Sequence, residues 1–351
     1  MKKFTTLFGA ALLAGSALLA TAPAQAGDEL TVTSWGGAYS ESQRKAYYEP
    51  YNAMGNKIPE AEYNGEVAKI KAMVEAKAIT WDVIDVDSPT ALQACAEGAL
   101  ETIDWAKLGL DKSKFIGGDV MECAVPTIVY GTVFGYDTTK ITGEGPKVIG
   151  DLFDTAKFPG KRGLWKSPFV NLEWALIADG VAKEDVYKVL GTPEGVDKAF
   201  AKLDTIKADI VWWEAGAQAP QLLADGQVVM TSAWNGRLQA AIDKDAKPFK
   251  IVWDHQNLDW DWWAITKGTP KLEEAYRFLA FASGAAPQAD QTNYIAYGPA
   301  NMDAIPNVNA KTLPNLPTAP ENLKTAFNLD SQFWADNGDQ LKERFNAWLA
   351  K

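Results

Sequence analysis

The chain has 351 residues, with 34 basic against 45 acidic side chains and a formal net charge of −11. This acidic balance argues against nucleic acids and anionic membranes as partners, because both bind positive surface. It suits a cationic ligand, and the length is enough for two domains of ordinary size.

The N-terminal segment, residues 1–26, has the pattern of a secretion signal. Lysines follow Met1, an apolar run extends over Leu7–Ala20, and the small-residue motif Ala24–Ala26 ends the segment. The apolar run is shorter than the roughly 20 residues that span a membrane. We therefore expect a cleaved signal peptide and a mature protein in the periplasm, with an uncleaved anchor as the alternative. No cysteine follows the cleavage site to accept a lipid.

The first part of the mature chain alternates strand and helix signals. The order is a strand, a glycine turn and a helix, followed by a second helix, a buried strand and a third helix. These expected elements cover Glu29–Ser34, Trp35–Gly37, Ser40–Tyr48, Lys69–Lys77, Trp81–Val86 and Thr90–Gly98. Such alternation predicts an α/β fold with a mostly parallel sheet, in which ligands bind beyond the carboxyl ends of the strands.

A long extended stretch, Val125–Tyr136, contains no turn cluster and is expected to cross from one lobe into another. The segment after it carries its own α/β signals. They cover Lys161–Trp165, Asn171–Ile177, Pro193–Ile206, Gln218–Leu223 and Val228–Thr231. We expect Trp260–Thr266 to return the chain to the first lobe, so that two crossing strands form a hinge.

The end of the chain predicts a helix, a wrapping loop and a closing amphipathic helix. These cover Lys271–Phe281, Pro306–Pro320 and Ser331–Leu349. The resulting division assigns residues 27–133 to lobe 1, 134–259 to lobe 2, 260–320 to the return into lobe 1, and 321–351 to a C-terminal helical segment.

Cys95 and Cys123 are the only cysteines, and an oxidising compartment favours a disulfide between them. The alternative is two buried free thiols. Two separated thiols and the single His255 lack the clustered spacing of metal sites, so we expect no metal and no cofactor.

Five short motifs, in this order, resemble the periplasmic substrate-binding proteins of polyamine (spermidine/putrescine)-type ABC transporters. They are Ser34–Tyr39, Trp81–Ile84, Thr132–Tyr136, Trp234–Gly236 and Asp261–Ile265. The resemblance covers essentially the whole mature chain. It implies a type II periplasmic-binding-protein fold with two α/β lobes joined by a two-strand hinge. It also implies hinge closure on the ligand and docking of the closed form on ABC permease subunits.

In the family that the motifs resemble, carboxylates hold the ligand amines and aromatic rings line the alkyl chain. The positions that match these roles are Trp35, Tyr39, Asp87 or Ser88, Glu173, Trp234 and Asp261. An ammonium leaves water favourably only where carboxylates and ring faces replace its hydration. Trp35 and Trp234 each precede a glycine turn at a strand end, which favours a ligand role over core packing.

Two of the candidate acids have structural alternatives. Asp261 interrupts an aromatic run, where a buried acid needs a cationic partner, either the ligand or a protein Arg or Lys. Glu173 opens a helix, where an acid also interacts favourably with the helix dipole.

Arg237 departs from the polyamine pattern, which tends to have an Asp at this position. A guanidinium repels a diamine but binds a carboxylate through two hydrogen bonds. The main prediction is a receptor for putrescine or spermidine. The alternative is a receptor for an amino-carboxylate such as 4-aminobutyrate, with Arg237 binding the carboxylate. If Arg237 points out of the cleft, or neutralises Glu173 or Glu214, the polyamine site remains.

Enzyme motifs are absent from the sequence, and His255 lacks an evident nucleophile partner, so we expect a binding protein, not an enzyme. Asp85 and Asp87 could imitate the carboxylate pair of a glycosidase. Their i,i+2 spacing places both on one face of a strand, however, so a carboxylate on the opposite side of a substrate is not assured. The remaining alternatives are a secreted enzyme and a sensory receptor. Expected partners are a small amine and a permease, with no nucleic acid, and the protein is expected to be a monomer.

Overall fold

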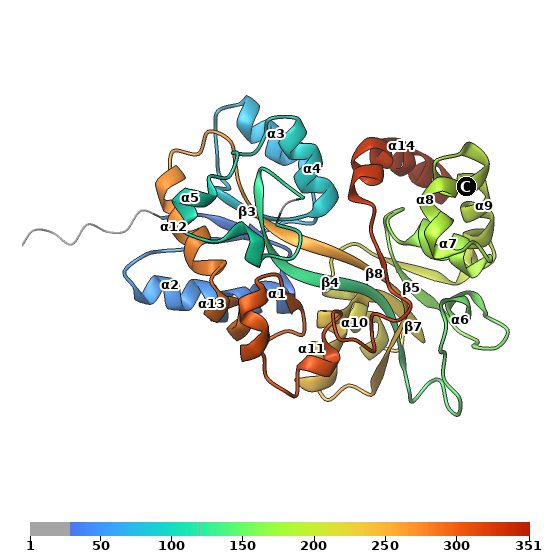
Figure 1. Cartoon of the computed structure of the whole chain (residues 1–351). Helices are drawn as coiled ribbons and strands as arrows, with labels where there is room; N and C mark the ends of the chain where they lie inside the picture. Colours follow the sequence, from blue (N-terminus) through green and yellow to red (C-terminus); the bar gives the residue numbers. More distant parts are fainter. Residues whose placement is uncertain (1–28, 119) are drawn as a thin grey trace, which may run out of the picture.

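The computed structural model describes residues 29–118 and 120–351, and the predicted signal peptide lies outside them. In the described chain, ten strands form one mixed sheet in the order β2-β1-β3-β8-β4-β7-β5-β6, with β9 paired to β4 and β10 paired to β8. Figure 1 shows the helices gathered into two groups, with β4 and β8 running between them. The α/β architecture with two lobes and two crossing strands is therefore present.

The first lobe combines the N-terminal part of the chain with the segment that returns after β8. Its elements are β1 (Val32–Ser34), α1 (Gly37–Gln43), a π-helix (Arg44–Tyr48), α2 (Glu49–Ala53), β2 (Glu60–Glu62), α3 (Val67–Glu75), β3 (Val83–Asp87), α4 (Ser88–Ala96), α5 (Trp105–Leu108), α12 (Leu272–Ala282), α13 (Ala285–Gln291) and β9 (Gly298–Pro299). Strand β1 pairs in parallel with both β2 and β3.

The second lobe is built from the middle of the chain. Its elements are α6 (Ile149–Phe153), β5 (Arg162–Trp165), α7 (Asn171–Ala178), α8 (Val186–Leu190), α9 (Pro193–Asp204), β6 (Ile210–Trp213), α10 (Gln218–Ala224), β7 (Met230–Trp234) and α11 (Asn235–Asp243). Strand β5 pairs in parallel with both β6 and β7.

The two crossing strands are β4 (Ala124–Asp137) and β8 (Phe249–Ile265). They run antiparallel to each other, and each is also antiparallel to its other neighbour, β7 or β3. The sheet is therefore mixed, whereas the sequence predicted a mostly parallel sheet. The antiparallel pairs arise because one strand carries the chain out of the first lobe and the other carries it back. The lobe boundaries at residues 133, 259 and 320 stay a prediction.

Strand β8 begins well before Trp260, where the sequence predicted the return strand. Its pairing with β4 shifts register between Thr132 and Phe134, so that residues 253–256 bulge from the ladder. His255 lies in this bulge with φ 50°, and its carbonyl accepts a hydrogen bond from Trp174 Nε1 at 2.8 Å. His255 is thus part of a strand irregularity between the lobes.

Three large apolar clusters hold the molecule together. One lies in the first lobe around Trp263 and Phe278, and another lies in the second lobe around Trp174 and Phe200. The third joins residues of both lobes, because it contains Trp35, Tyr39 and Ile84 together with Trp213, Trp234 and Leu238. The lobes therefore share apolar contacts where they face each other.

The C-terminal region returns to the hinge and then to the second lobe. Short strand β10 (Phe327–Asn328) pairs in parallel with β8. Helix α14 (Ser331–Leu349) follows and buries one stripe, with Trp334, Leu341 and Phe345 in the core of the second lobe. The same helix also contacts α4 of the first lobe, so it borders both lobes.

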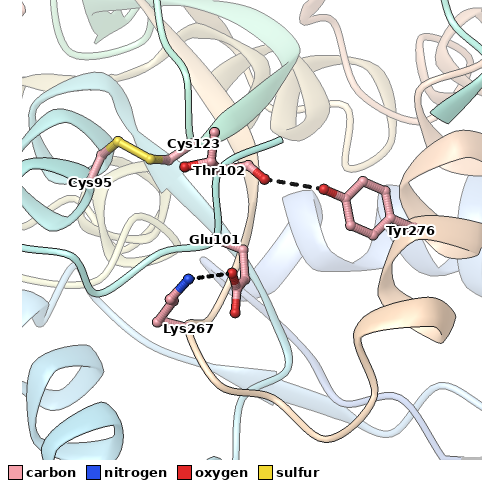
Figure 2. The surroundings of a disulfide bond; sticks show 6 residues. All are labelled: Cys95, Glu101, Thr102, Cys123, Lys267 and Tyr276. Carbon is pink, nitrogen blue, oxygen red and sulfur yellow. Dashed lines mark hydrogen bonds and ion pairs between the residues drawn. A yellow bond between two sulfur atoms is a disulfide. The ribbon is translucent and has the colours of Figure 1, made fainter. Parts of the chain in front are cut away.

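A disulfide joins Cys95, near the end of α4, to Cys123, just before β4, with 5.7 Å between the two Cα atoms. Figure 2 shows the bond beside the segment that contains Glu101 and Thr102. Tyr276 donates a hydrogen bond to the Thr102 carbonyl at 3.2 Å, and Lys267 forms an ion pair with Glu101 at 2.7 Å. The disulfide therefore fixes the start of the crossing strand β4 to helix α4 of the first lobe.

Candidate functional site

A small cavity lies between the lobes, at the ends of β1, β3 and β7 and beside both crossing strands. The nine residues that line it are Trp35, Tyr39, Asp87, Tyr130, Trp165, Trp234, Arg237, Asp261 and Tyr297. Its free volume of about 20 Å³ is enough for about one water molecule. A larger ligand therefore reaches these residues only if the lobes or the rings move apart.

Aromatic rings from both lobes form most of the cavity wall. Trp234 lies edge-on to Trp35 of the first lobe with ring centroids 5.9 Å apart, and edge-on to Trp165 at 5.6 Å. Tyr39 makes a similar contact with Tyr297 at 5.3 Å. Ring faces and edges arranged in this way exclude water and can accept a cation over a face.

The acids of the cavity come from two paired strands. Asp87 of β3 lies directly opposite Asp261 of β8 in the ladder. Residues paired in this way have Cβ atoms about 5 Å apart, so one ammonium group can contact both carboxylates.

Behind this pair lies Asp85, which is fully buried. Its carboxylate accepts hydrogen bonds from Trp35 Nε1 at 3.2 Å, from the Tyr39 hydroxyl at 2.9 Å and from the Gln43 amide. Trp35 and Tyr39 line the cavity, so Asp85 fixes the positions of two wall residues.

Crowding and burial make these carboxyl groups hard to ionise. Burial raises the pKa of Asp261 well above its ordinary value, and the nearby charges of Asp85, Asp259 and Asp87 raise it further. Burial also raises the pKa of Asp85 and of Asp87. The pKa of Asp259 rises to about 7, again through burial and the charge of Asp87. The cluster therefore favours either a proton or a cation among its oxygens.

Arg237 extends from α11 of the second lobe to the backbone of the first. Its Nη1 donates to the Gly36 carbonyl at 2.9 Å, and its Nη2 donates to the Trp35 carbonyl at 3.0 Å. The guanidinium carbon lies 5.1 Å from the centre of the Trp234 ring. Its Nε is buried and has no acceptor among the described residues. A charged group whose Nε donor is unused can therefore bind an anionic atom in this cavity.

Glycines allow the close approach of Arg237 to both lobes. A Cβ atom on Gly216 would lie 2.6 Å from Nε of Arg237 and 2.2 Å from the Trp234 ring. A Cβ atom on Gly37, which has φ 59°, would lie 2.9 Å from Nη1. A side chain at either position would push the guanidinium away.

The structure brings six of the eight predicted site residues together and places the other two elsewhere. Trp35, Tyr39, Asp87, Trp234, Arg237 and Asp261 all line the cavity. The Ser88 hydroxyl instead accepts a hydrogen bond from Trp262 Nε1 at 2.8 Å, on the side of α4 where a separate pocket lies.

Glu173 lies in the first turn of α7, inside the second lobe. It accepts hydrogen bonds from Trp334 Nε1 at 2.7 Å and from the Tyr187 hydroxyl at 3.2 Å. Burial raises its pKa to about 7. The predicted acid of the cleft thus contacts the C-terminal helix, and no ion pair joins it to Arg237 in the described chain.

Sequence reasoning missed three cavity residues and the role of Asp85. Tyr130 lies inside a predicted crossing strand, and its direction from the strand could have been inferred from the alternation of faces. Trp165 and Tyr297 have no local signal, because they reach the cavity through tertiary folding alone. Asp85 lies two residues before Asp87, on the same face of β3.

The described residues contain no group of three or more His, Cys, Asp or Glu side chains arranged to hold a metal ion. In residues 29–118 and 120–351, no helix has the length and apolar character needed to cross a bilayer.

Comparison with known proteins gives one consistent family. The sequence model described as bacterial extracellular solute-binding protein matches residues 46–318. A gamma-aminobutyric acid-binding protein from Pseudomonas aeruginosa is 45% identical over 352 residues, which cover 100% of this chain and 99% of that protein.

Solved structures agree with this assignment. A periplasmic binding protein from A. tumefaciens B6, in complex with glucopine, is 34% identical with a TM-score of 0.86; the match covers 92% of this chain and 100% of that one. A GABA receptor is 36% identical with a TM-score of 0.81, over 92% of this chain and 98% of that one. These similar proteins are thus binding proteins, and two of them are named for 4-aminobutyrate.

Proposed function

The chain belongs to the bacterial extracellular solute-binding proteins of ABC transporters, and from this premise we propose that its ligand is an amino-carboxylate such as 4-aminobutyrate. The ligand ammonium lies between Asp87 and Asp261, and the ligand carboxylate binds Arg237. The closed receptor then delivers the ligand to an ABC permease.

The observation that carries this proposal is the unused Nε donor of Arg237 in a cavity whose other charged residues are acids. A diamine would place a second positive charge near this guanidinium, which is unfavourable in a buried site. An amino-carboxylate supplies a cation for the acids and an anion for the arginine. Both charges are then paired away from water.

The amino-carboxylate alternative therefore has better support than the polyamine prediction. An acidic net charge of the whole chain does not describe a single cavity. The relatives named for 4-aminobutyrate support the alternative reading. Arg237 supports it too, because it lines the cavity and its donated hydrogen bonds go to backbone carbonyls rather than to Glu173 or Glu214.

Calorimetric titration of the mature protein with 4-aminobutyrate, putrescine and spermidine tests the proposal. We expect 4-aminobutyrate to bind more tightly than either polyamine. Arg237→Ala should weaken its binding by about 10- to 100-fold, which is the range for a charge-assisted hydrogen bond. Arg277, exposed on α12 and paired with Glu274, offers a matched control, because Arg277→Ala removes the same charge far from the cavity.

Two results would overturn the proposal. One is tighter binding of putrescine or spermidine than of 4-aminobutyrate to the wild-type protein. The other is an affinity for 4-aminobutyrate that Arg237→Ala leaves unchanged. Delivery is tested separately by uptake of labelled 4-aminobutyrate in cells that express the receptor with its transporter, compared with cells that lack the receptor.

A further inference from the structure

The bulge of β8, residues 253–256, lies where the two crossing strands pass from one lobe to the other. Before the bulge, residues 249–252 pair with the part of β4 that also pairs with β7 of the second lobe. After it, β8 pairs with the earlier part of β4 and with β3 of the first lobe. Val133 of β4 lies opposite the four bulged residues, so the ladder between the crossing strands is interrupted at this level.

The residues of the bulge up to His255 are hydrogen-bonded to the second lobe. Trp174 Nε1 of α7 donates to the His255 carbonyl at 2.8 Å, and the backbone N–H of Ile149, the first residue of α6, donates to the Asp254 carboxylate at 2.8 Å. The backbone N–H of His255 donates to the Thr325 hydroxyl at 3.0 Å. Both backbone polar groups of His255 therefore have partners that hold its conformation.

The next residue, Gln256, is hydrogen-bonded to a loop on the side of the first lobe. Its buried side-chain amide donates to the Asn322 carbonyl at 2.6 Å and to the Pro317 carbonyl at 2.9 Å. Leu316 of the same loop packs with Ala296, which lies two residues before β9 of the first lobe. The contacts of β8 thus change from one lobe to the other between two consecutive residues.

His255, at this boundary, has a left-handed backbone conformation with φ 50°. Such a conformation is unfavourable for a residue with a Cβ atom. A rotation about the backbone bonds of a single boundary residue changes the relative orientation of the two bodies that it joins. The lobes contact each other in this structure, where Arg237 donates hydrogen bonds from the second lobe to the first. The left-handed conformation therefore accompanies the arrangement in which the lobes are together.

We propose that His255 is a pivot of lobe closure, with a left-handed backbone when the lobes are closed and a negative φ when they are open. The unfavourable backbone conformation then opposes closure, and the contacts made by the ligand have to offset it. One determinant of ligand affinity thus lies in the hinge and outside the cavity. This inference concerns closure, so it does not depend on the identity of the ligand.

Substitutions at His255 that differ in their tolerance of a positive φ test the proposal by calorimetric titration with 4-aminobutyrate. Glycine adopts this conformation without the Cβ penalty, and asparagine adopts it more readily than alanine. We expect His255→Gly to bind the ligand about three- to tenfold more tightly than His255→Ala, with His255→Asn between them. All three variants lack the imidazole, so the loss of the ring does not affect the comparison.

Lys77 provides a matched control. It has φ 52°, close to that of His255, but it lies in the turn after α3, within the first lobe. Lys77→Gly and Lys77→Ala should therefore bind 4-aminobutyrate with equal affinity. A difference in affinity at position 255 without one at position 77 assigns the effect to the hinge.

Small-angle X-ray scattering of the same variants without ligand measures closure directly. His255→Gly should have a smaller radius of gyration than His255→Ala, because more of its molecules are closed, and the two Lys77 variants should not differ. If His255→Gly does not fold, His255→Asn takes its place in both comparisons.

The outcomes separate this inference from the proposed function. Equal affinities of His255→Gly and His255→Ala for 4-aminobutyrate would overturn the pivot and leave the proposed function intact. If 4-aminobutyrate binds none of the proteins, the proposed function fails, and the scattering data alone decide about the pivot. In that case a smaller radius of His255→Gly supports the pivot, and equal radii overturn it.

Discussion

Binding of the ligand should release a proton. In the empty protein, burial and neighbouring carboxylates raise the pKa of Asp261 well above its ordinary value, so that this carboxyl group retains a proton more readily than an ordinary aspartate does. A ligand ammonium beside Asp261 stabilises the carboxylate and lowers this pKa. The proton and the ammonium thus compete for the same oxygens, so ligand binding should be accompanied by proton release.

The sign and size of the pH effect follow from this competition. Because the empty form holds more protons than the bound form, affinity rises with pH as long as Asp261 is protonated in one and ionised in the other. One proton released corresponds to a gain of about tenfold in affinity per pH unit. Asp259, with a pKa of about 7, can add to the release at pH 6 and adds little at pH 8.

Calorimetric titrations at pH 6, 7 and 8, each in two buffers with different heats of ionisation, measure the number of protons released. Asp261→Asn provides the control, because it removes the titrating group and should reduce the release at pH 8 to near zero while weakening binding. An affinity that is constant from pH 6 to 8, together with observed heats that do not depend on the buffer, would refute the reasoning.

Three further outcomes are expected. Glu173 has a pKa of about 7 in the folded protein against an ordinary value of 4.5, so the free energy of unfolding should fall by about 3 kcal/mol as pH rises from 4.5 through 7. Urea unfolding at pH 4.5 and 8 should show this loss in the wild type and not in Glu173→Gln, and an equal change in the two proteins would contradict it. Reducing the bond between Cys95 and Cys123, which closes a segment with a sequence separation of 28, should lower the free energy of unfolding by about 3 to 4 kcal/mol; the variant with alanine at both positions should not respond to the reductant, and an unaltered unfolding midpoint in the reduced wild type would argue against this. Gly216→Ala places a methyl group against Arg237 and the Trp234 ring and should weaken 4-aminobutyrate binding at least tenfold; full affinity would show that both side chains can move without loss.

Much of the fold follows from local patterns in the sequence. The amphipathic stripe of α14 predicts its bounds, Ser331–Leu349, as the structure has them. The apolar run of β3 and the long extended run of β4 likewise predict a buried strand and a crossing strand. These elements have a clear period or a continuous apolar composition, which the sequence alone displays.

Other elements conflict with local patterns. The helix that carries Arg237, α11, begins with Asn235 and Gly236, which are typical of a turn. Strand β8 contains Asp254, His255 and Asp259, and such polar residues do not predict a central strand. Tertiary contacts outweigh propensity here, since Asp259 accepts a hydrogen bond from Tyr130.

Candidate site residues were predictable where a motif marks the end of a strand, as for Trp35, Trp234 and Asp261. Glu173 shows the limit of such reasoning. An acid in the first turn of a helix has the same local sequence whether it faces a cleft or a distant helix. Its hydrogen-bond donor Trp334 lies 161 residues further along the chain, and no local pattern announces that contact.

The link from Arg237 to the backbone of Trp35 and Gly36 bears on how a transporter distinguishes full receptors from empty ones. If the receptor closes without ligand, the Nε donor of Arg237 has no acceptor, and no ammonium group lies between the carboxylates of Asp87 and Asp261. Closure is therefore unfavourable until a ligand binds. A transporter that recognises only the closed conformation would then seldom bind an empty receptor. The charged groups inside the cleft thus set the cost of closing without ligand.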